Sequence, residues 1–326
     1  MQSAIPEFAI LGAGAMGSIV AAHLARAGHS VVVLARAQRA RDIEQHGLRI
    51  RGLIEFTQRV PVISDPAMFR GAAVLILGTK THGTDAALAP IRGADIGVAF
   101  SMQNGMMKND QLINALGRQR VLGSLADASG EVLPSGEVLF TRNGMLYLGE
   151  LDGRDSARAH KIASSIAAAG VNTSAVANIL TLEWSKFASW VGMMALSVTT
   201  RAYSWKFLID PNTALVVVRL VREIGALAAA HDVQLSDRST LPVASLCQSS
   251  EAQAVARLDE LGRHMQHSAP QHRMSTLQDL NAGRTLEVEE TLGFALREAQ
   301  RLKVPTPLLD AMYHLIAGID QIQRMS

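Results

Sequence analysis

Several kinds of protein are excluded by what this sequence lacks. It has one cysteine, Cys247, among 326 residues, so neither an intrachain disulfide nor a cysteine-rich zinc site is available. A lone thiol fits a reducing, cytosolic compartment. The formal net charge is only +2, which argues against a nucleic-acid-binding protein that depends on a broad basic face.

Membrane and targeting signals are also missing from the sequence. No apolar run reaches the roughly 18 residues that a membrane-spanning helix needs. Residues 1–17 have no basic region ahead of their apolar stretch, which leads directly into a glycine-rich turn, so we expect no signal peptide. These absences predict a cytoplasmic protein that binds neither nucleic acid nor a membrane.

The character of the chain changes near residue 178. Before this point, short apolar runs alternate with helical patterns, which is typical of a parallel α/β sheet. After it, strand signals stop and helical patterns cover residues 180–202, 211–231, 250–266, 284–302 and 306–322. We therefore predict an α/β domain at 1–178 and an all-helical substrate and catalytic domain at 179–326, with a ligand site in the cleft between them.

A glycine pattern marks the first strand–helix junction. Gly12, Gly14 and Gly17 form G-x-G-x-x-G directly after an apolar run. The first glycine allows a tight turn, the second lets the backbone approach a pyrophosphate, and the third lets helix and strand pack closely. Ala15 and Met16 then open a helix whose N–H groups can bind phosphate. An ordinary glycine turn is the alternative, but the strand–turn–helix context favours a Rossmann-type, doubly wound dinucleotide-binding sheet.

The end of the second predicted strand favours NADPH/NADP+ as the cofactor. NAD-binding domains usually carry an acidic residue about 20 residues after the glycines, where it bonds the ribose 2′-OH. Here Arg36 takes that place, close to Arg39 and Arg41, and the next acid is Asp42. A guanidinium can bind a 2′-phosphate with two parallel hydrogen bonds. A solvated loop arginine is the alternative.

Two further strand ends place polar residues at the same edge of the sheet. Lys80 follows "ILGT" and Asn104 follows "FSMQ". Ligands of open α/β sheets lie beyond the carboxyl ends of the strands, so both residues are candidates for the cofactor site. Each could also be a simple turn or capping residue, since Asn-Gly is a common turn pair.

The stretch "EWSKFASWVGMMALSVTTRAY", residues 183–203, predicts an apolar helix with one lysine near its start. A helix this apolar is expected to be buried. Lys186 then either extends its ammonium to water or is held for chemistry, where its pKa can be tuned. The periodicity leaves both interpretations open.

Taken together, these motifs resemble the ketopantoate reductase (2-dehydropantoate 2-reductase) family over nearly the whole chain. The resemblance rests on "ILGAGAMGS", "LAR", "TK", "QNG", "EWSKFA" and the block that starts "MSTLQDLNAGRTLEVEE". The run S-x-L-Q-D-x-x-x-G-R-x-x-E within that block is its most specific part. The resemblance implies a Rossmann domain followed by a helical domain, and reduction of a 2-oxo acid with NADPH.

Site residues follow from the same resemblance. It implies that the three glycines hold the pyrophosphate, that Arg36 meets the 2′-phosphate, and that Lys80 and Asn104 lie by the cofactor. It also implies that Asn104 and Ser275 contact the substrate, that Lys186 is the catalytic general acid, and that Glu287 bonds the reacting oxygen. These residue types suit the reaction, because hydride delivery leaves charge on a carbonyl oxygen that a lysine can stabilise and protonate.

Each of these roles has a structural alternative. Ser275 could be the N-cap of the helix it begins. Glu287 could belong, with Glu289 and Glu290, to an exposed acidic helix start. Without the family resemblance, these interpretations would be preferred.

One departure from the family pattern bears on the substrate. The family usually has asparagines four and eight residues after the lysine, on the same helix face, where they bind the substrate. Here these positions are Trp190 and Met194, which predicts an apolar wall in the substrate site. A site that has lost such hydrogen-bonding groups should discriminate poorly for the hydroxylated substrate, so we expect a bulkier or more apolar 2-oxo acid.

Two rival functions remain open. The first is an oxidoreductase of a β-hydroxy acid, or a reductase of a different, more apolar carbonyl or of an imine, on the same scaffold, which the "QNG" and "LQD" blocks oppose. The second is a non-catalytic NADP-binding protein, which the retained Lys186 and Glu287 oppose. No metal is expected, since the histidines between residues 231 and 314 lack ligand spacing. The apolar helical half could support a homodimer.

Overall fold

The computed structural model describes residues 5–325, and the chain divides into two compact units, Met1–Leu180 and Thr181–Ser326. The predicted domain boundary at 178/179 and this division both fall at the start of the same helix, α6 (Ile179–Thr200). Residues 1–4, on which part of the signal-peptide expectation rests, lie outside the described residues. Of the helices that residues 5–325 form, none is both long and apolar enough to span a bilayer.

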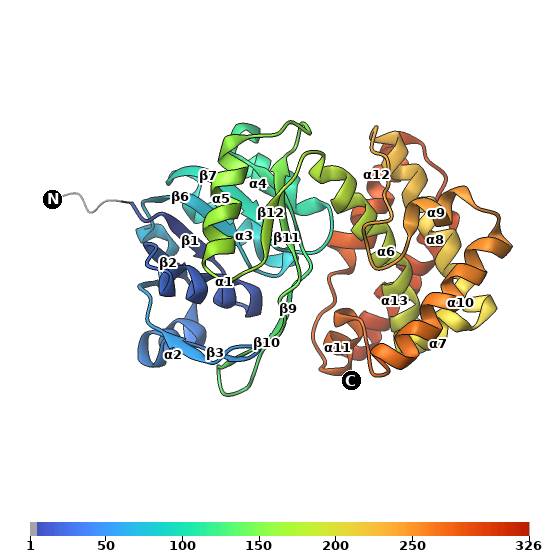
Figure 1. Cartoon of the computed structure of the whole chain (residues 1–326), viewed down its shortest axis with the longest axis horizontal. Coiled ribbons are helices and arrows are strands. Elements are labelled where there is room, and N and C mark those ends of the chain that lie inside the picture. The colour runs from blue at the N-terminus through green and yellow to red at the C-terminus, as the bar shows by residue number, and fades with distance from the viewer. Residues whose placement is uncertain (1–4, 326) are drawn as a thin grey trace. The chain divides into compact units, whose positions relative to one another are not determined.

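A five-stranded parallel sheet forms the centre of unit 1 (Figure 1). Its order is β5-β2-β1-β6-β7, so the chain runs outward from β1 through β2 and then outward in the opposite direction through β6. Ligands bind at such a reversal, beyond the carboxyl ends of the strands. The strands are β1 (Phe8–Leu11), β2 (Val31–Leu34), β5 (Val62–Ile63), β6 (Gly71–Leu77) and β7 (Asp95–Ser101).

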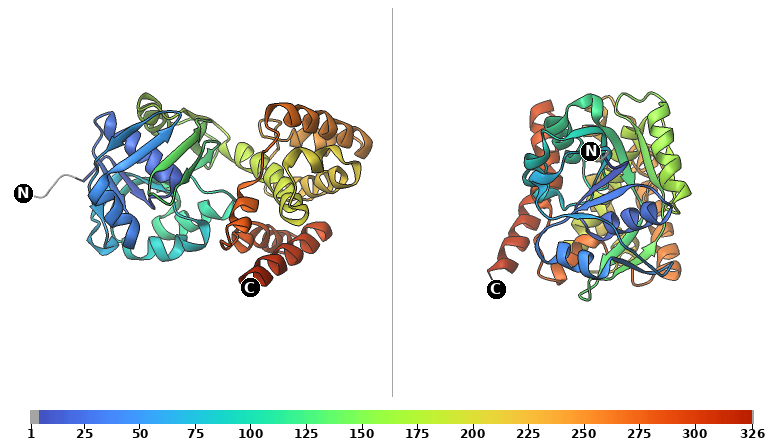
Figure 2. Two further views of the ribbon diagram at one scale, coloured as in Figure 1. Left: turned by 90° about the horizontal axis from the view of Figure 1, so that it is seen from below. Right: turned by 90° about the vertical axis from the view of Figure 1, so that its left-hand side faces the viewer.

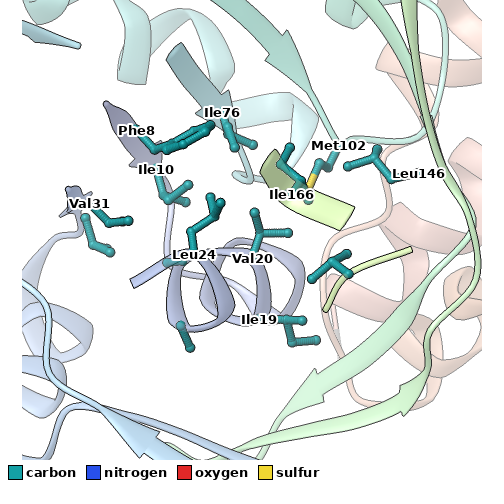
Figure 3. Close-up of a cluster of buried hydrophobic side chains, with 14 of the residues drawn as sticks. Phe8, Ile10, Ile19, Val20, Leu24, Val31, Ile76, Met102, Leu146 and Ile166 are labelled. Carbon is teal, nitrogen blue, oxygen red and sulfur yellow. The ribbon is translucent and has the colours of Figure 1, made fainter. Parts of the chain in front are cut away.

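Helices of unit 1 pack on both faces of this sheet. They are α1 (Ala15–Arg26), α2 (Ala37–His46), α3 (Thr84–Leu88), α4 (Met107–Leu116) and α5 (Ala157–Ala168), with 3₁₀ turns at 66–68, 81–83, 89–91 and 118–120. Successive strand residues face opposite ways. Ile10 therefore belongs to one buried cluster with Val20 of α1 and Ile166 of α5 (Figure 3), whereas Leu11 belongs to another with Leu112 of α4. The predicted Rossmann-type sheet is confirmed, and its uninterrupted apolar strands follow from burial on both faces.

Two smaller sheets complete unit 1. The apolar runs "RVLGSLAD" and "MLYLGEL" predict the strands β8 and β11, but the way these strands pair was not predicted. A four-stranded sheet has the order β4-β3-β10-β9, and a three-stranded sheet has the order β12-β11-β8. β8 and β11 pair antiparallel, which a simple strand–helix alternation does not produce. The strands are β3 (Leu48–Gly52), β4 (Phe56–Gln58), β8 (Leu122–Ala126), β9 (Ser129–Val132), β10 (Val138–Arg142), β11 (Leu146–Glu150) and β12 (Thr173–Ala175).

Unit 2 consists of helices and loops throughout its described residues, 181–325, as Figure 1 and Figure 2 show from three sides. Asp210 caps α8 by accepting the N–H of Thr213, and Ser250 and Gln253 form a reciprocal capping box at the start of α10. The helices after α6 are α7 (Ser204–Ile209), α8 (Pro211–Ala230), α9 (Val243–Gln248), α10 (Glu251–Ser268), α11 (Ser275–Asn281), α12 (Phe294–Leu302) and α13 (Pro307–Arg324).

The predicted continuous helix at 284–302 is wrong in its first part. Residues 284–287 are not helical, and Glu289–Gly293 form a π-helical turn, η5, before α12 begins. A tertiary contact holds this segment, because the Asp320 carboxylate of α13 accepts the N–H of Leu286 at 3.1 Å. Such a contact competes with helical periodicity and leaves no local sequence signal.

Candidate functional site

The three motif glycines occupy positions that larger residues would disturb in different ways. Gly12 has φ +101°, and a Cβ there would lie 2.6 Å from Thr79 Cγ2. A Cβ on Gly17 would lie 2.2 Å from the carbonyl oxygen of Gly12. A Cβ on Gly14 would meet only the Gly78 carbonyl oxygen, at 3.2 Å. Gly12 and Gly17 are thus required by packing, whereas a side chain at Gly14 would have only this one close neighbour.

The first turn of α1 fits a pyrophosphate. Gly14 is the N-cap and has no side chain to satisfy the first N–H groups, which belong to Ala15 and Met16. Backbone N–H groups and the positive end of a helix dipole favour phosphate oxygens. The glycine turn and this helix start therefore suit the cofactor that the sequence predicts.

Arg39 holds the glycine turn in place. Its guanidinium donates to the Ala13 carbonyl at 3.0 Å, to Ser18 Oγ at 3.0 Å, to Asp42 at 2.8 Å and to the Gly136 carbonyl at 2.6 Å. These bonds commit the side chain to the fold. Sequence reasoning missed this role, because the carbonyls that Arg39 binds are distant in the sequence.

Arg36 stands apart from its two neighbours in the arginine group. It is the exposed N-cap residue of α2, directly beyond the end of β2, and the next residue, Ala37, has φ +49°. Arg41 is bonded to Gln38 at 2.9 Å. Of the three arginines, Arg36 therefore lies where a 2′-phosphate is expected in this fold.

Lys80 and Asn104 follow neighbouring strands of the sheet. Leu77 of β6 is paired with Ser101 of β7. Lys80 lies three residues after Leu77, and Asn104 lies three residues after Ser101. Lys80 is exposed and Asn104 is half-buried. The structure therefore brings both to the edge that also carries the glycine turn, while their roles stay predictions.

In unit 2, α6 carries Lys186 within an otherwise buried segment. Residues 182–185 and 187–189 are buried, whereas Lys186 and Trp190 are half-buried. Met194 is 1% exposed. Residues four apart lie on one helix face, so these three form a row along α6. The indole N–H of Trp190 is buried and has no hydrogen-bond acceptor within residues 5–325.

Two serines beside this row serve the packing of unit 2. Ser185 donates to the Thr181 carbonyl at 2.6 Å and accepts the N–H of Ser236 at 2.8 Å. Ser189 accepts the N–H of Leu241 at 3.0 Å. Both hydroxyls are thus engaged with backbone groups of their own unit.

Ser275 and Glu287 lie in two other segments of unit 2. The N-cap of α11 is Met274, so the alternative that Ser275 is an N-cap is wrong; Ser275 is the first helical residue and is exposed. Glu287 is half-buried just before the π-helical turn, a feature that often occurs at functional sites. Glu289, by contrast, is exposed and accepts a hydrogen bond from Tyr313 Oη at 2.5 Å.

Comparison with known proteins identifies the group to which this chain is related. The family model for ketopantoate reductase PanE/ApbA matches residues 8–153, and the model for its C-terminal part matches residues 178–320. The chain belongs to the ketopantoate reductase family. The predicted family is therefore confirmed, and with it an oxidoreductase that acts on a CH–OH/C=O group. Ketopantoate reductases use NADPH.

Individual relatives span almost the whole chain. A 2-dehydropantoate 2-reductase from Archaeoglobus fulgidus is 26% identical and aligns over 95% of this chain and 97% of its own. The crystal structure of a PanE/ApbA family ketopantoate reductase from Ralstonia eutropha JMP134 is also 26% identical, with a TM-score of 0.81 and coverage of 97% and 99%. D-mandelate dehydrogenase with NADH and anilino(oxo)acetate shares the fold, with a TM-score of 0.82, 20% identity and coverage of 97% and 99%.

No metal centre accompanies these groups in the part of the chain that the structure describes. Within residues 5–325, no three histidine, cysteine, aspartate or glutamate side chains gather as a metal site would require. The candidate residues of unit 1 are instead arginine, lysine and asparagine, which suit an anionic cofactor, and those of unit 2 include lysine, serine and glutamate.

Proposed function

We propose that the protein reduces a 2-oxo acid to a 2-hydroxy acid with NADPH and that Lys186 is the general acid. The observation that carries the proposal is the half-buried position of Lys186 in a helix segment whose other residues, 182–185 and 187–189, are buried. Holding a lysine in such a place costs desolvation free energy, and catalysis explains why it is retained. The family match over residues 178–320 includes this helix.

The residues present fit the cofactor and divide the work between them. Bound NADPH would supply the hydride to the carbonyl carbon. Lys186 would stabilise the charge that develops on the carbonyl oxygen and donate a proton to it, which yields the hydroxyl group. Glu287 would keep that ammonium charged and oriented. Asn104 and Ser275 would hold the carboxylate end of the substrate.

Trp190 and Met194 support a substrate that is more apolar than ketopantoate. An indole and a thioether form a wall suited to a large or aromatic side chain. The D-mandelate dehydrogenase that shares this fold was solved with an aryl-bearing oxo acid, anilino(oxo)acetate.

A graded panel of 2-oxo acids would test the proposed function. NADPH oxidation is measured with ketopantoate, with branched aliphatic oxo acids and with phenyl-bearing oxo acids such as benzoylformate. We expect turnover, with the highest kcat/KM for the larger apolar members. Failure to oxidise NADPH with every oxo acid would overturn the proposal.

Adding cyclic imines with NADPH and β-hydroxy acids with NADP+ to the panel separates the rival functions. Reduction of the imines or oxidation of the β-hydroxy acids, without turnover of 2-oxo acids, would identify a different oxidoreductase on this scaffold. Tight NADPH binding by fluorescence, with no turnover of any carbonyl, would identify a non-catalytic NADP-binding protein.

We also propose a cytoplasmic location and a homodimer. A lone cysteine supports the reducing compartment, and the exposed Leu315 and Ile322 of α13 supply apolar surface for self-association. Cell fractionation tests the first proposal, and size-exclusion chromatography with light scattering tests the second.

A further inference from the structure

The loops that carry Lys80 and Asn104 are joined by one buried side chain. Thr79 immediately precedes Lys80 in the loop after β6, and Gln103 immediately precedes Asn104 in the loop after β7. Gln103 is 8% exposed. Its side-chain amide lies between the two loops, so its contacts determine how the two candidate cofactor residues are placed relative to each other.

Both ends of the Gln103 amide are hydrogen-bonded. Nε2 donates to the Thr79 carbonyl at 2.8 Å, to Thr84 Oγ1 at 2.7 Å and, at 3.1 Å, to Thr79 Oγ1. Oε1 accepts from Ser101 Oγ at 2.8 Å. A buried amide with all its groups engaged fixes one geometry, because any shift of either loop would leave a buried donor or acceptor unpaired.

Lys108 holds the same residue through its backbone. This lysine of α4 is 3% exposed, and its ammonium donates to the Gln103 carbonyl at 3.3 Å and to the Ser124 carbonyl of β8. Ser124 Oγ in turn donates to the Ser101 carbonyl. Hydrogen bonds from an ammonium are stronger than neutral ones, so the loop after β7 is tied to β8 as well as to β6.

The network extends to the glycine turn through Thr79. A Cβ on Gly12 would lie 2.6 Å from Thr79 Cγ2 and 2.7 Å from the Thr79 nitrogen, so the turn and the loop after β6 are in close contact. The amide that fixes Thr79 therefore connects three loops at the carboxyl edge of the sheet: the glycine turn, the Lys80 loop and the Asn104 loop.

We infer that Gln103 is a positioning residue of the cofactor site, which locks the Lys80 and Asn104 loops into one NADPH-binding unit, and that Lys108 supports it from α4. This inference rests on the proposed function, since it takes Lys80 and Asn104 to be cofactor ligands. Gln103 acts through these two residues and has no direct role in the reaction.

The test uses Gln103→Leu, which keeps the side-chain volume and removes every amide bond. Gln111→Leu is the matched control, because Gln111 is also a buried glutamine of unit 1, 5% exposed, and its Oε1 has no partner within residues 5–325. NADPH affinity is measured by fluorescence titration, together with thermal unfolding. We expect Gln103→Leu to raise the Kd for NADPH at least tenfold and Gln111→Leu to change it less than twofold.

A double-mutant cycle separates positioning from general loss of stability. If Gln103 acts through Lys80, then Gln103→Leu should weaken binding much less when Lys80→Ala is already present. Thr84→Val removes a single acceptor of the Gln103 amide and should raise the Kd in the same direction, roughly threefold. This variant keeps the inference testable if Gln103→Leu does not fold.

Two results would overturn the inference while leaving the proposed function intact. The first is that the wild-type protein binds NADPH and that Gln103→Leu and Gln111→Leu bind it with the same Kd. The other is strict additivity of Gln103→Leu and Lys80→Ala. Absence of NADPH binding by the wild-type protein would instead reject the proposed function together with the inference.

Discussion

Arg36 is the residue on which the choice between NADPH and NADH depends. Arg39 is bonded to the backbone and Arg41 to Gln38, which leaves Arg36 as the guanidinium at the end of β2. Arg36→Ala should raise KM for NADPH by about 10- to 100-fold, the equivalent of losing a charge-assisted contact, and change KM for NADH little. Steady-state kinetics with both cofactors, with Arg41→Ala as the control, would check this. Equal effects of Arg36→Ala on both cofactors would refute a 2′-phosphate role.

Trp190 is the residue that we expect to set substrate preference. Trp190→Asn restores the amide that the family usually carries at this position and removes the apolar wall. We predict that it raises kcat/KM for ketopantoate relative to benzoylformate by about tenfold, since a buried hydrogen bond to substrate is worth about that factor. Trp190→Phe keeps the bulk without the N–H and should not produce this shift. An unchanged ratio in Trp190→Asn would show that Trp190 does not face the substrate.

At the residue scale, the sequence predicted the glycine turn well because its spacing carries a local backbone requirement. It did not reveal Arg39, Gln103 or Lys108, whose partners are carbonyls and hydroxyls of distant segments. The N-cap alternative for Ser275 was wrong for a similar reason, since the start of α11 is set one residue earlier, at Met274. Site residues defined by tertiary contacts leave little trace in a single sequence.

The β1–α1 turn gives a prediction at the element scale. Gly17→Ala should disrupt folding, because its Cβ would lie 2.2 Å from the backbone oxygen of Gly12, closer than any real Cβ contact. Gly14→Ala should fold normally, because its Cβ would meet only the Gly78 carbonyl at 3.2 Å, yet weaken NADPH binding at least tenfold by blocking the pyrophosphate. Circular dichroism and fluorescence titration would measure both. Normal NADPH affinity in a folded Gly14→Ala would argue against a pyrophosphate at this turn.

The contact between β11 and α5 predicts how stability depends on pH. Arg158 donates to both oxygens of Glu150, at 2.6 and 2.7 Å, and these bonds lower the pKa of the buried Glu150 carboxyl. A lowered folded-state pKa means that this stabilisation is complete above the ordinary glutamate pKa of about 4.3 and is lost as pH falls through the folded value. The free energy of unfolding should therefore decrease as the pH falls from about 4.3 through the lower folded-state pKa of Glu150.

Glu150→Gln tests this pair directly. It should cost about 1 kcal/mol at pH 7, a small value because Arg158 is 31% exposed and water screens the pair, and it should flatten the acid limb of the stability curve. Urea denaturation between pH 3 and pH 7 gives both quantities. The matched variant Glu251→Gln, at an exposed pair with Arg219, should leave the curve nearly unchanged. An unaltered acid limb in Glu150→Gln would show that the pair does not contribute.

Helices and strands were predictable where one periodicity governs a whole segment. The buried strands β1, β2, β6 and β7 and the long helices α6, α8 and α10 follow this rule. The segment 284–302 does not, because the bond from Leu286 to Asp320 and the π-helical turn interrupt a regular apolar pattern. In the small sheets of unit 1, β8 and β11 were predicted, whereas five other strands of three to five residues were missed because so short a segment carries too little periodic signal: β3, β4, β9, β10 and β12.

At the scale of the whole molecule, an α/β unit and a helical unit were predicted from the change of pattern near residue 178. The sheet topology and the family comparisons confirm the fold class and the family. The substrate is harder to predict from the sequence, because Trp190 and Met194 depart from the family pattern that would define it. The proposed function therefore rests most on Lys186.

The most direct test of the account is the oxidation of NADPH with the best 2-oxo acid of the panel, by the wild-type protein and by Lys186→Ala. Lys161→Ala, at an exposed lysine of α5, serves as the control. If Lys186 is the general acid, its replacement should lower kcat by about 10²- to 10⁴-fold while the Kd for NADPH and the thermal unfolding midpoint change little. A kcat for Lys186→Ala equal to that of Lys161→Ala would contradict the central claim.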